Sequence, residues 1–213
     1  MASQISMDEV AKCVLDGLEN AHKEYFEWSD GEYIWSAPEY LLTVNIAKEL
    51  KKSKEVKYLT LEDNVEYILE NANVECKGEI HKALRKDGRF DIVLWGSDKE
   101  PTPPIAIVEV KNKVYCFGRI EEDIERIKQT LLMMQSTIEF GLMAFYATNT
   151  YKGLDNNFNG LVEGLLKNTQ ECLNGKSGKE QFCIEKFERH IQDKDNIING
   201  NVYRPIVFKI QKK

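Results

Sequence analysis

The sequence is poor in the residues that build zinc centres and disulfide frameworks. It has three scattered histidines and five cysteines, an odd number, with no CxxC pair among them. This pattern argues against a structural zinc site and against a disulfide scaffold. We expect all five cysteines to be reduced thiols: Cys13, Cys76, Cys116, Cys172 and Cys183.

Long apolar runs and a basic net charge are lacking as well. No segment approaches the roughly 18 consecutive apolar residues of a membrane span, and the first residues lack the basic-then-apolar layout of a signal peptide. We therefore expect a cytoplasmic protein with no membrane partner. The net charge of −6 argues against a coat protein for nucleic acid, which needs a basic surface. It does not exclude a nuclease, whose metal site needs carboxylates and whose basic groove is local.

What the sequence contains is ordinary for a globular protein. The 213 residues, 42% hydrophobic and 30% charged, suffice for one domain with a substantial core. No internal repeat or low-complexity linker divides them. We predict a single α/β domain over residues 1–213.

Hydrophobic periodicity predicts the order of the elements. Helices are expected over residues 6–26, 36–53, 120–136 and 161–173, and strands over residues 56–61, 89–95, 105–111, 140–149 and 202–213. Residues 64–71 fit a short helix. Pro205 suggests an edge position for the last strand, because proline donates no backbone hydrogen bond.

Three charged residues stand inside the two most apolar strands. Asp91 lies near the start of the first strand, and Glu109 and Lys111 lie at the end of the second, in "RFDIVLW" and "IAIVEVK". An isolated ionised group in a central strand costs several kcal/mol unless it is paired or bound to a cation. Two carboxylates on neighbouring strands offer oxygen ligands to Mg²⁺. A lysine two residues along the same face could orient a nucleophile or neutralise developing charge.

This arrangement resembles the PD-(D/E)XK nuclease superfamily. Asp91 is followed, after seventeen intervening residues, by Glu109-Val110-Lys111 on the next strand. The superfamily's restriction-endonuclease-like core runs α-β-β-β-α-β, a mixed central sheet flanked by helices, and the expected elements follow that order. The resemblance covers residues 36–149, so residues 1–35 and 150–213 are N- and C-terminal additions. The sequence departs from the family pattern in one position, where Phe90 replaces the proline before the aspartate.

The resemblance implies hydrolysis of phosphodiester bonds in nucleic acid, usually DNA, with Mg²⁺ or, as a substitute, Mn²⁺. Asp91 and Glu109 would be metal ligands together with the backbone carbonyl of Val110, and Lys111 would position or activate the attacking water. Cutting both strands of a duplex would favour a two-fold homodimer with one site per strand.

Two other interpretations stay open. In the first, Asp91 hydrogen-bonds a loop while Glu109 and Lys111 pair at the solvated end of a strand. In the second, the fold is kept without catalysis, as a module that binds protein or nucleic acid. A nuclease is expected to have basic or aromatic walls around its site, and a binding module need not.

Glu39 and the helix over residues 120–136 supply further candidates. Relatives in the superfamily often carry a glutamate in the first core helix that completes the metal site, and Glu39 fits that place; Glu49 and Glu62 are weaker alternatives. Ser36 and Glu39 also fit a helix capping box, so both interpretations stand.

Lys128 and Gln129 are candidates for substrate contact on the later helix. The competing interpretation is a solvated helix face with acid–base pairs such as Asp123 with Arg126.

Overall fold

The computed structural model describes residues 6–53, 56–74, 82–84, 87–96, 102–150, 156–175, 181–189, 197–198 and 201–213. The strands are β1 (Tyr58–Asn64), β2 (Arg89–Trp95), β3 (Pro104–Val114), β4 (Phe140–Thr150), β5 (Phe182–Glu188), β6 (Ile197–Ile198) and β7 (Asn201–Lys212). The α-helices are α1 (Met7–Trp28), α2 (Glu39–Leu50), α3 (Val65–Asn71), α4 (Glu121–Leu132) and α5 (Asn156–Asn174). Short 3-10 turns occupy η1 (Ile34–Ser36), η2 (Lys82–Leu84) and η3 (Phe117–Arg119).

The strands form one mixed sheet in the order β1-β2-β3-β4-β7-β5, with the short β6 paired to β7. β1 pairs with β2 and β2 pairs with β3 in antiparallel fashion, whereas β3 and β4 are parallel. A parallel pair needs a crossover connection, and α4 supplies it. The predicted α/β class is confirmed, and so is the predicted succession of α2, β1, β2, β3, α4 and β4, with α3 inserted after β1.

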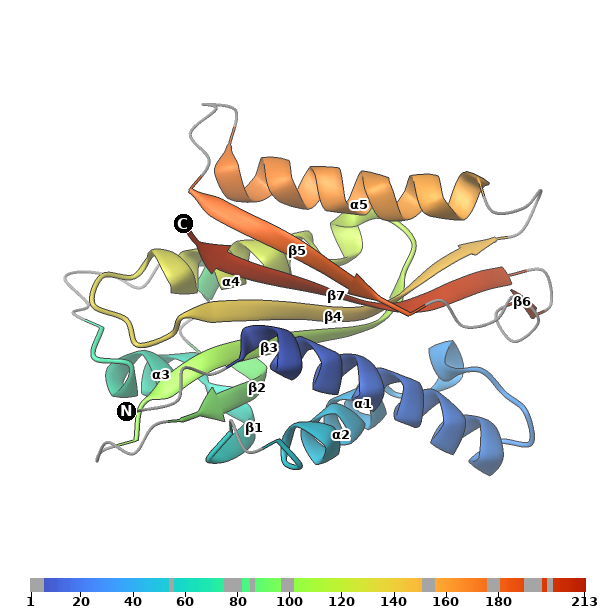
Figure 1. Ribbon diagram of the computed structural model, residues 1–213, viewed down its shortest axis with the longest axis horizontal. Helices are drawn as coiled ribbons and strands as arrows, with labels where there is room; N and C mark the ends of the chain where they lie inside the picture. Colours follow the sequence, from blue (N-terminus) through green and yellow to red (C-terminus); the bar gives the residue numbers. More distant parts are fainter. Residues whose placement is uncertain are drawn as a thin grey trace.

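Helices cover both faces of the sheet (Figure 1). α1 and α2 lie on one face, and α4 and α5 lie on the other. Each face has its own apolar cluster. Val93, Ile107 and Phe145 belong to the cluster under α4 and α5, and Ile92, Val108 and Val110 belong to the cluster under α1 and α2. Because both faces of β3 are covered, every residue from Pro104 to Val110 is buried.

α1 begins as its sequence predicts. The Ser6 hydroxyl accepts a hydrogen bond from the Glu9 backbone N–H at 3.4 Å, which satisfies one of the free donors of the first turn. The expected apolar stripe is buried from Val10 to Ala21. Trp28 is the last residue of the helix and lies beyond that stripe, and it is 66% exposed.

The start of α2 differs from the predicted capping box. Ser36 ends η1, and the residue that precedes the helix is Pro38, with no capping hydrogen bond from a side chain. Proline holds the preceding residue extended, and Ala37 has a ψ of 153°. Ser36 is thereby kept out of the first turn of α2, and the Glu39 carboxylate is left available for other contacts.

The C-terminal strand is not an edge strand as its proline suggested. β7 lies between β4 and β5. Its pairing with β5 ends at Glu188 opposite Ile206, so Pro205 falls one residue beyond that ladder. The sequence analysis did not predict β5, a short strand in which the charged residues Glu185 and Lys186 interrupt the apolar pattern, as is common at sheet edges.

The segments outside the predicted core build onto the same sheet. β7 pairs with β4 over the full length of β4, and α1 packs along α2. Lys209 of β7, only 7% exposed, forms ion pairs with Asp8 at the start of α1 and with Glu185 of β5. α1 and β7 are therefore both tied to the sheet that carries the site.

The crossing of α1 and α2 depends on Gly17. A Cβ atom there would lie 2.4 Å from the Cα atom of Ile46, closer than atoms can pack. Gly17→Ala is therefore expected to lower the free energy of unfolding by about 1–3 kcal/mol. Gly164→Ala on α5 meets nothing within 4 Å and is the control, expected to gain up to about 1 kcal/mol from helix propensity. Urea unfolding measures both, and equal stabilities would contradict the close helix contact.

Candidate active site

Three carboxylates form a row across neighbouring strands on the face that α4 covers. The register is set by two adjacent pairs: Leu61 with Ile92, and Ile92 with Val108. Extending each register by one residue sets Glu62 of β1 opposite Asp91 of β2, and Asp91 opposite Glu109 of β3. Glu62 itself has a left-handed backbone with a φ of 56°. The charge of Glu62 still acts on Asp91, and that of Asp91 acts on Glu109. Like charges opposite each other on adjacent strands repel, so this row needs cations or protons. We call Glu62, Asp91 and Glu109 the acidic row.

Asp91 is fixed by the backbone of the neighbouring strand. Its Oδ2 accepts a hydrogen bond from the Val110 N–H at 2.7 Å. Burial raises the pKa of the Asp91 carboxyl; the Val110 hydrogen bond and the charge of Lys111 lower it only in part, and Glu39 and Glu62 raise it further. The carboxylate is thus held in place but is poorly compensated when ionised.

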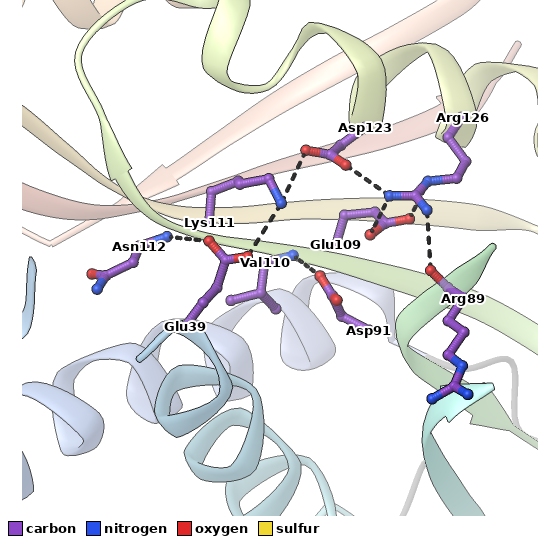
Figure 2. Close-up of polar contacts among 9 residues, drawn as sticks. All are labelled: Glu39, Arg89, Asp91, Glu109, Val110, Lys111, Asn112, Asp123 and Arg126. Atoms are coloured by element: carbon purple, nitrogen blue, oxygen red, sulfur yellow. Dashed lines mark hydrogen bonds and ion pairs between the residues drawn. The ribbon is translucent and has the colours of Figure 1, made fainter. Parts of the chain in front are cut away.

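Glu109 is the most deeply buried member of the acidic row, with 1% of its surface exposed. Its partner is Arg126 of α4: the guanidinium Nε lies 2.9 Å from Oε1, and Nη2 donates to Oε2 at 3.2 Å (Figure 2). The shorter contact does not have hydrogen-bond geometry, and Oε1 has no hydrogen-bond partner. Burial raises the pKa of Glu109 well above its ordinary value, although the charge of Arg126 lowers it.

Lys111 projects between two carboxylates that come from different helices. Its Nζ lies 3.2 Å from Glu39 Oε1 and 3.5 Å from Asp123 Oδ2 (Figure 2). Burial alone would lower the pKa of Lys111, but the charges of Asp123, Glu39 and Asp91 outweigh it and the pKa is raised. Lys111 is therefore a cation at neutral pH. The expected pairing of Glu109 with Lys111 at a solvated strand end is not what the structure contains.

Glu39 joins this site and does not cap its own helix. Its Oε1 accepts from Lys111, and its Oε2 accepts from the Asn112 backbone N–H at 3.0 Å. The Asn112 side chain in turn donates to the carbonyls of Ile34 and Ala37 at 2.7 and 2.8 Å. Asn112 thus fixes the turn before α2, which places Glu39 against the end of β3.

The structure places Glu39, Asp91, Glu109 and Lys111 close together, with Asp123 and Arg126 beside them (Figure 2); their metal-binding and catalytic roles stay predictions. Arg126 donates to Asp123 at 2.7 Å and to the Arg89 carbonyl at 3.0 Å. Asp123 and Arg126 form the predicted helix pair, but they lie buried against β3 and not on the solvated face that the sequence suggests. A charge count could have indicated that a further cation was needed. The three carboxylates of Glu39, Asp91 and Glu109 outnumber the single cation Lys111.

The remaining candidates lie elsewhere. Lys128 donates to Glu125 and to the Cys172 carbonyl of α5, and Gln129 donates to Glu125; substrate contact by Lys128 and Gln129 stays a prediction. Glu49 binds Asn20 and Lys52, away from the acidic row. Metal binding by the Val110 carbonyl also stays a prediction.

The chemistry of the site fits a divalent cation. In the described part of the chain, the five carboxylates of Glu39, Asp123 and the acidic row are accompanied by two cations, Lys111 and Arg126, which leaves three negative charges when all are ionised. Carboxylate oxygens are the ligands that Mg²⁺ prefers, and Glu109 Oε1 is a buried acceptor without a donor. Among the described residues, no three His, Cys, Asp or Glu side chains are already gathered as a metal cage. The guanidinium of Arg126 stands against Glu109 instead.

No family model, no curated protein and no solved structure matches this chain. None of the helices in the described residues is both long and apolar enough to span a bilayer. The free cysteines Cys13, Cys116, Cys172 and Cys183 agree with the expected thiols, and Cys76 lies outside the described residues.

Asp91→Asn is expected to stabilise the protein at neutral pH. Burial raises the folded-state pKa of Asp91 above that of the unfolded chain, so its ionisation opposes folding once the pH rises above the unfolded value. Asparagine keeps an acceptor for the Val110 N–H and removes the charge. We expect a gain of about 0.5–2 kcal/mol near neutral pH. The gain should vanish below about pH 4, where Asp91 is protonated in both states.

Urea unfolding across this pH range measures the difference between Asp91→Asn and the wild type. Asp87→Asn, which neutralises an exposed carboxylate just before β2, is the control and should show no comparable trend. A gain that does not change with pH, or a loss of stability near neutral pH, would contradict the claim that ionisation of the buried Asp91 opposes folding.

Proposed function

We propose that this chain is a metal-dependent nuclease that hydrolyses phosphodiester bonds in nucleic acid, with DNA as the first substrate to test. The observation that carries the proposal is the meeting of Asp91, Glu109 and Lys111 at one end of β3. Asp91 accepts from the amide of Val110, which lies between the other two in the chain. This is the residue set and the strand placement of the PD-(D/E)XK nucleases.

The sheet supports a restriction-endonuclease-like core. α2, β1, β2, β3, α4 and β4 follow one another as that core requires, with three antiparallel strands and a fourth parallel to the third. Glu39 at the start of α2 has the place of the glutamate that often completes the metal site in that superfamily.

In this proposal the carboxylates of Asp91, Glu109 and Glu39 and the Val110 carbonyl would hold Mg²⁺ or Mn²⁺. The metal, when bound, would polarise a phosphate oxygen and favour deprotonation of water. Lys111 is held as a cation by Asp123 and Glu39. It therefore acts as a donor that orients the attacking water and offsets the charge developing on the phosphate, and not as a base that removes a proton.

Basic and aromatic residues follow Lys111 directly, as a nuclease site requires. Lys113 is exposed on the same strand, Tyr115 is 53% exposed, and the Arg119 guanidinium lies 5.9 Å from the centre of the Tyr115 ring. Tyr40, next to Glu39, is also 51% exposed. Lysine and arginine neutralise phosphates and aromatic rings stack on bases, so these exposed residues suit the binding of a nucleic-acid strand.

The second candidate is a binding module without catalysis. It is favoured by the contact of Arg126 with Glu109, which neutralises one proposed metal ligand. The two candidates differ in metal dependence: the nuclease needs a divalent ion for its reaction, and the binding module needs none to hold its ligand.

A cleavage assay tests the proposal. Lys111→Met removes the ammonium and keeps most of the aliphatic stem, and it is expected to lower metal-dependent cleavage of DNA at least a hundredfold, within the range for loss of a charge-stabilising donor, about 10²–10³. Lys167→Met makes the same change at a 76% exposed side chain on α5 and should cleave like the wild type. The panel includes single-stranded and duplex DNA and RNA, each with Mg²⁺ or Mn²⁺.

Cleavage that needs a metal and is lost only in Lys111→Met would support the nuclease. Cleavage that survives in Lys111→Met would place the activity elsewhere. Metal-independent binding of nucleic acid, with no cleavage of any substrate in the panel, would favour the binding module.

A further inference from the structure

The Arg126 guanidinium occupies the place beside the acidic row where a cation is needed. It contacts both Glu109 oxygens, at 2.9 and 3.2 Å, and its side chain is only 12% exposed. A buried carboxylate and a buried guanidinium that separate must each find a new partner, because an unpaired buried charge is strongly unfavourable. A metal that takes Glu109 would therefore compete directly with Arg126.

Asp123 would keep Arg126 near the site after such a displacement. Asp123 lies three residues earlier on α4 and holds Arg126 Nη2 at 2.7 Å through one oxygen. Its other oxygen lies 3.5 Å from Lys111. Asp123 thus contacts both cations of the site. The guanidinium released from Glu109 would stay beside Lys111, and the Nε and Nη2 donors that had faced Glu109 would be free.

We propose that Arg126 and the divalent metal compete for Glu109, and that the displaced guanidinium binds a phosphate group of the substrate. The inference rests on the nuclease function proposed above and concerns how that site is regulated. Its consequence is coupling: the metal releases Arg126 for the phosphate, and the phosphate holds Arg126 away from the metal ligand. By linkage, metal and nucleic acid then raise each other's affinity by the same factor.

The chemistry of arginine suits both partners. Its planar fork of donors matches a carboxylate or a phosphate equally well. Because Arg126 occupies Glu109, one of the proposed metal ligands, the site binds metal weakly when no nucleic acid is present. The competing explanation is that Arg126 only fastens α4 to β2 and β3, through Glu109 and the Arg89 carbonyl. That role predicts no gain in metal affinity when the arginine is removed.

Metal binding without nucleic acid is the first test. Free Mn²⁺ is followed by electron paramagnetic resonance during titration of wild type, Arg126→Gln and Arg189→Gln. Arg189 is the matched control, since it also pairs with two carboxylates, those of Asp16 and Glu19, but outside the site. Competition predicts that Arg126→Gln binds Mn²⁺ roughly tenfold more tightly than wild type, within the usual range of coupling between sites, and that Arg189→Gln does not differ.

Coupling to nucleic acid is the second test, made in the Lys111→Met background so that the substrate stays intact. A short DNA duplex is expected to tighten Mn²⁺ binding by Lys111→Met severalfold. The same duplex should leave the Mn²⁺ affinity of the Arg126→Gln, Lys111→Met double variant unchanged.

The outcomes separate this inference from the nuclease function. If the wild type binds Mn²⁺ and Arg126→Gln binds it with equal or lower affinity, the competition is overturned and the nuclease proposal stands. No Mn²⁺ binding by either protein would overturn both. If Arg126→Gln fails to fold, Arg126→Lys replaces it. A lysine keeps the charge but contacts only one Glu109 oxygen. Competition then predicts a Mn²⁺ affinity between that of the wild type and that expected for the glutamine variant.

Discussion

The site depends on the electrostatic repulsion within the acidic row. Glu62, Asp91 and Glu109 lie on adjacent strands whose register is set by the pairing of β1, β2 and β3, so their charges act on one another once the sheet forms. On a covered face of the sheet this charge is offset only by groups that reach it from outside the row. Lys111 comes from the same strand as Glu109 and Arg126 comes from α4, and the negative charge that remains supports the proposal that a divalent cation binds there.

The rest of the fold positions these counter-charges. β3 is buried on both faces, which fixes Glu109 and Lys111 on one side of a rigid strand. α4, the crossover that makes β3 and β4 parallel, brings Asp123 and Arg126 over them. α2 begins at Pro38, and the Asn112 side chain ties the preceding turn to β3, so that Glu39 meets Lys111. Each of these elements is needed for structure and also contributes to the site: β3 and α4 contribute two groups each, and α2 contributes one.

The sequence predicted most of the fold because the apolar periods of its strands and helices are strong. It also predicted Asp91, Glu109 and Lys111, since charges inside apolar strands are unusual. It did not predict Arg126, because an arginine in an amphipathic helix looks the same whether it meets water or a buried glutamate. The capping box at Ser36 was wrong because Pro38 redirects the backbone, and β5 was missed because its charged residues hide the apolar alternation.

Anomalous diffraction from crystals soaked in Mn²⁺ tests most directly that the acidic row is built for a cation. The proposal predicts a manganese peak between the carboxylates of Asp91 and Glu109, with the Arg126 guanidinium turned away from Glu109 and still bound to Asp123. An empty site in manganese-saturated crystals, with Arg126 still paired to Glu109, would contradict it and would mean that Arg126 is a permanent structural partner of Glu109.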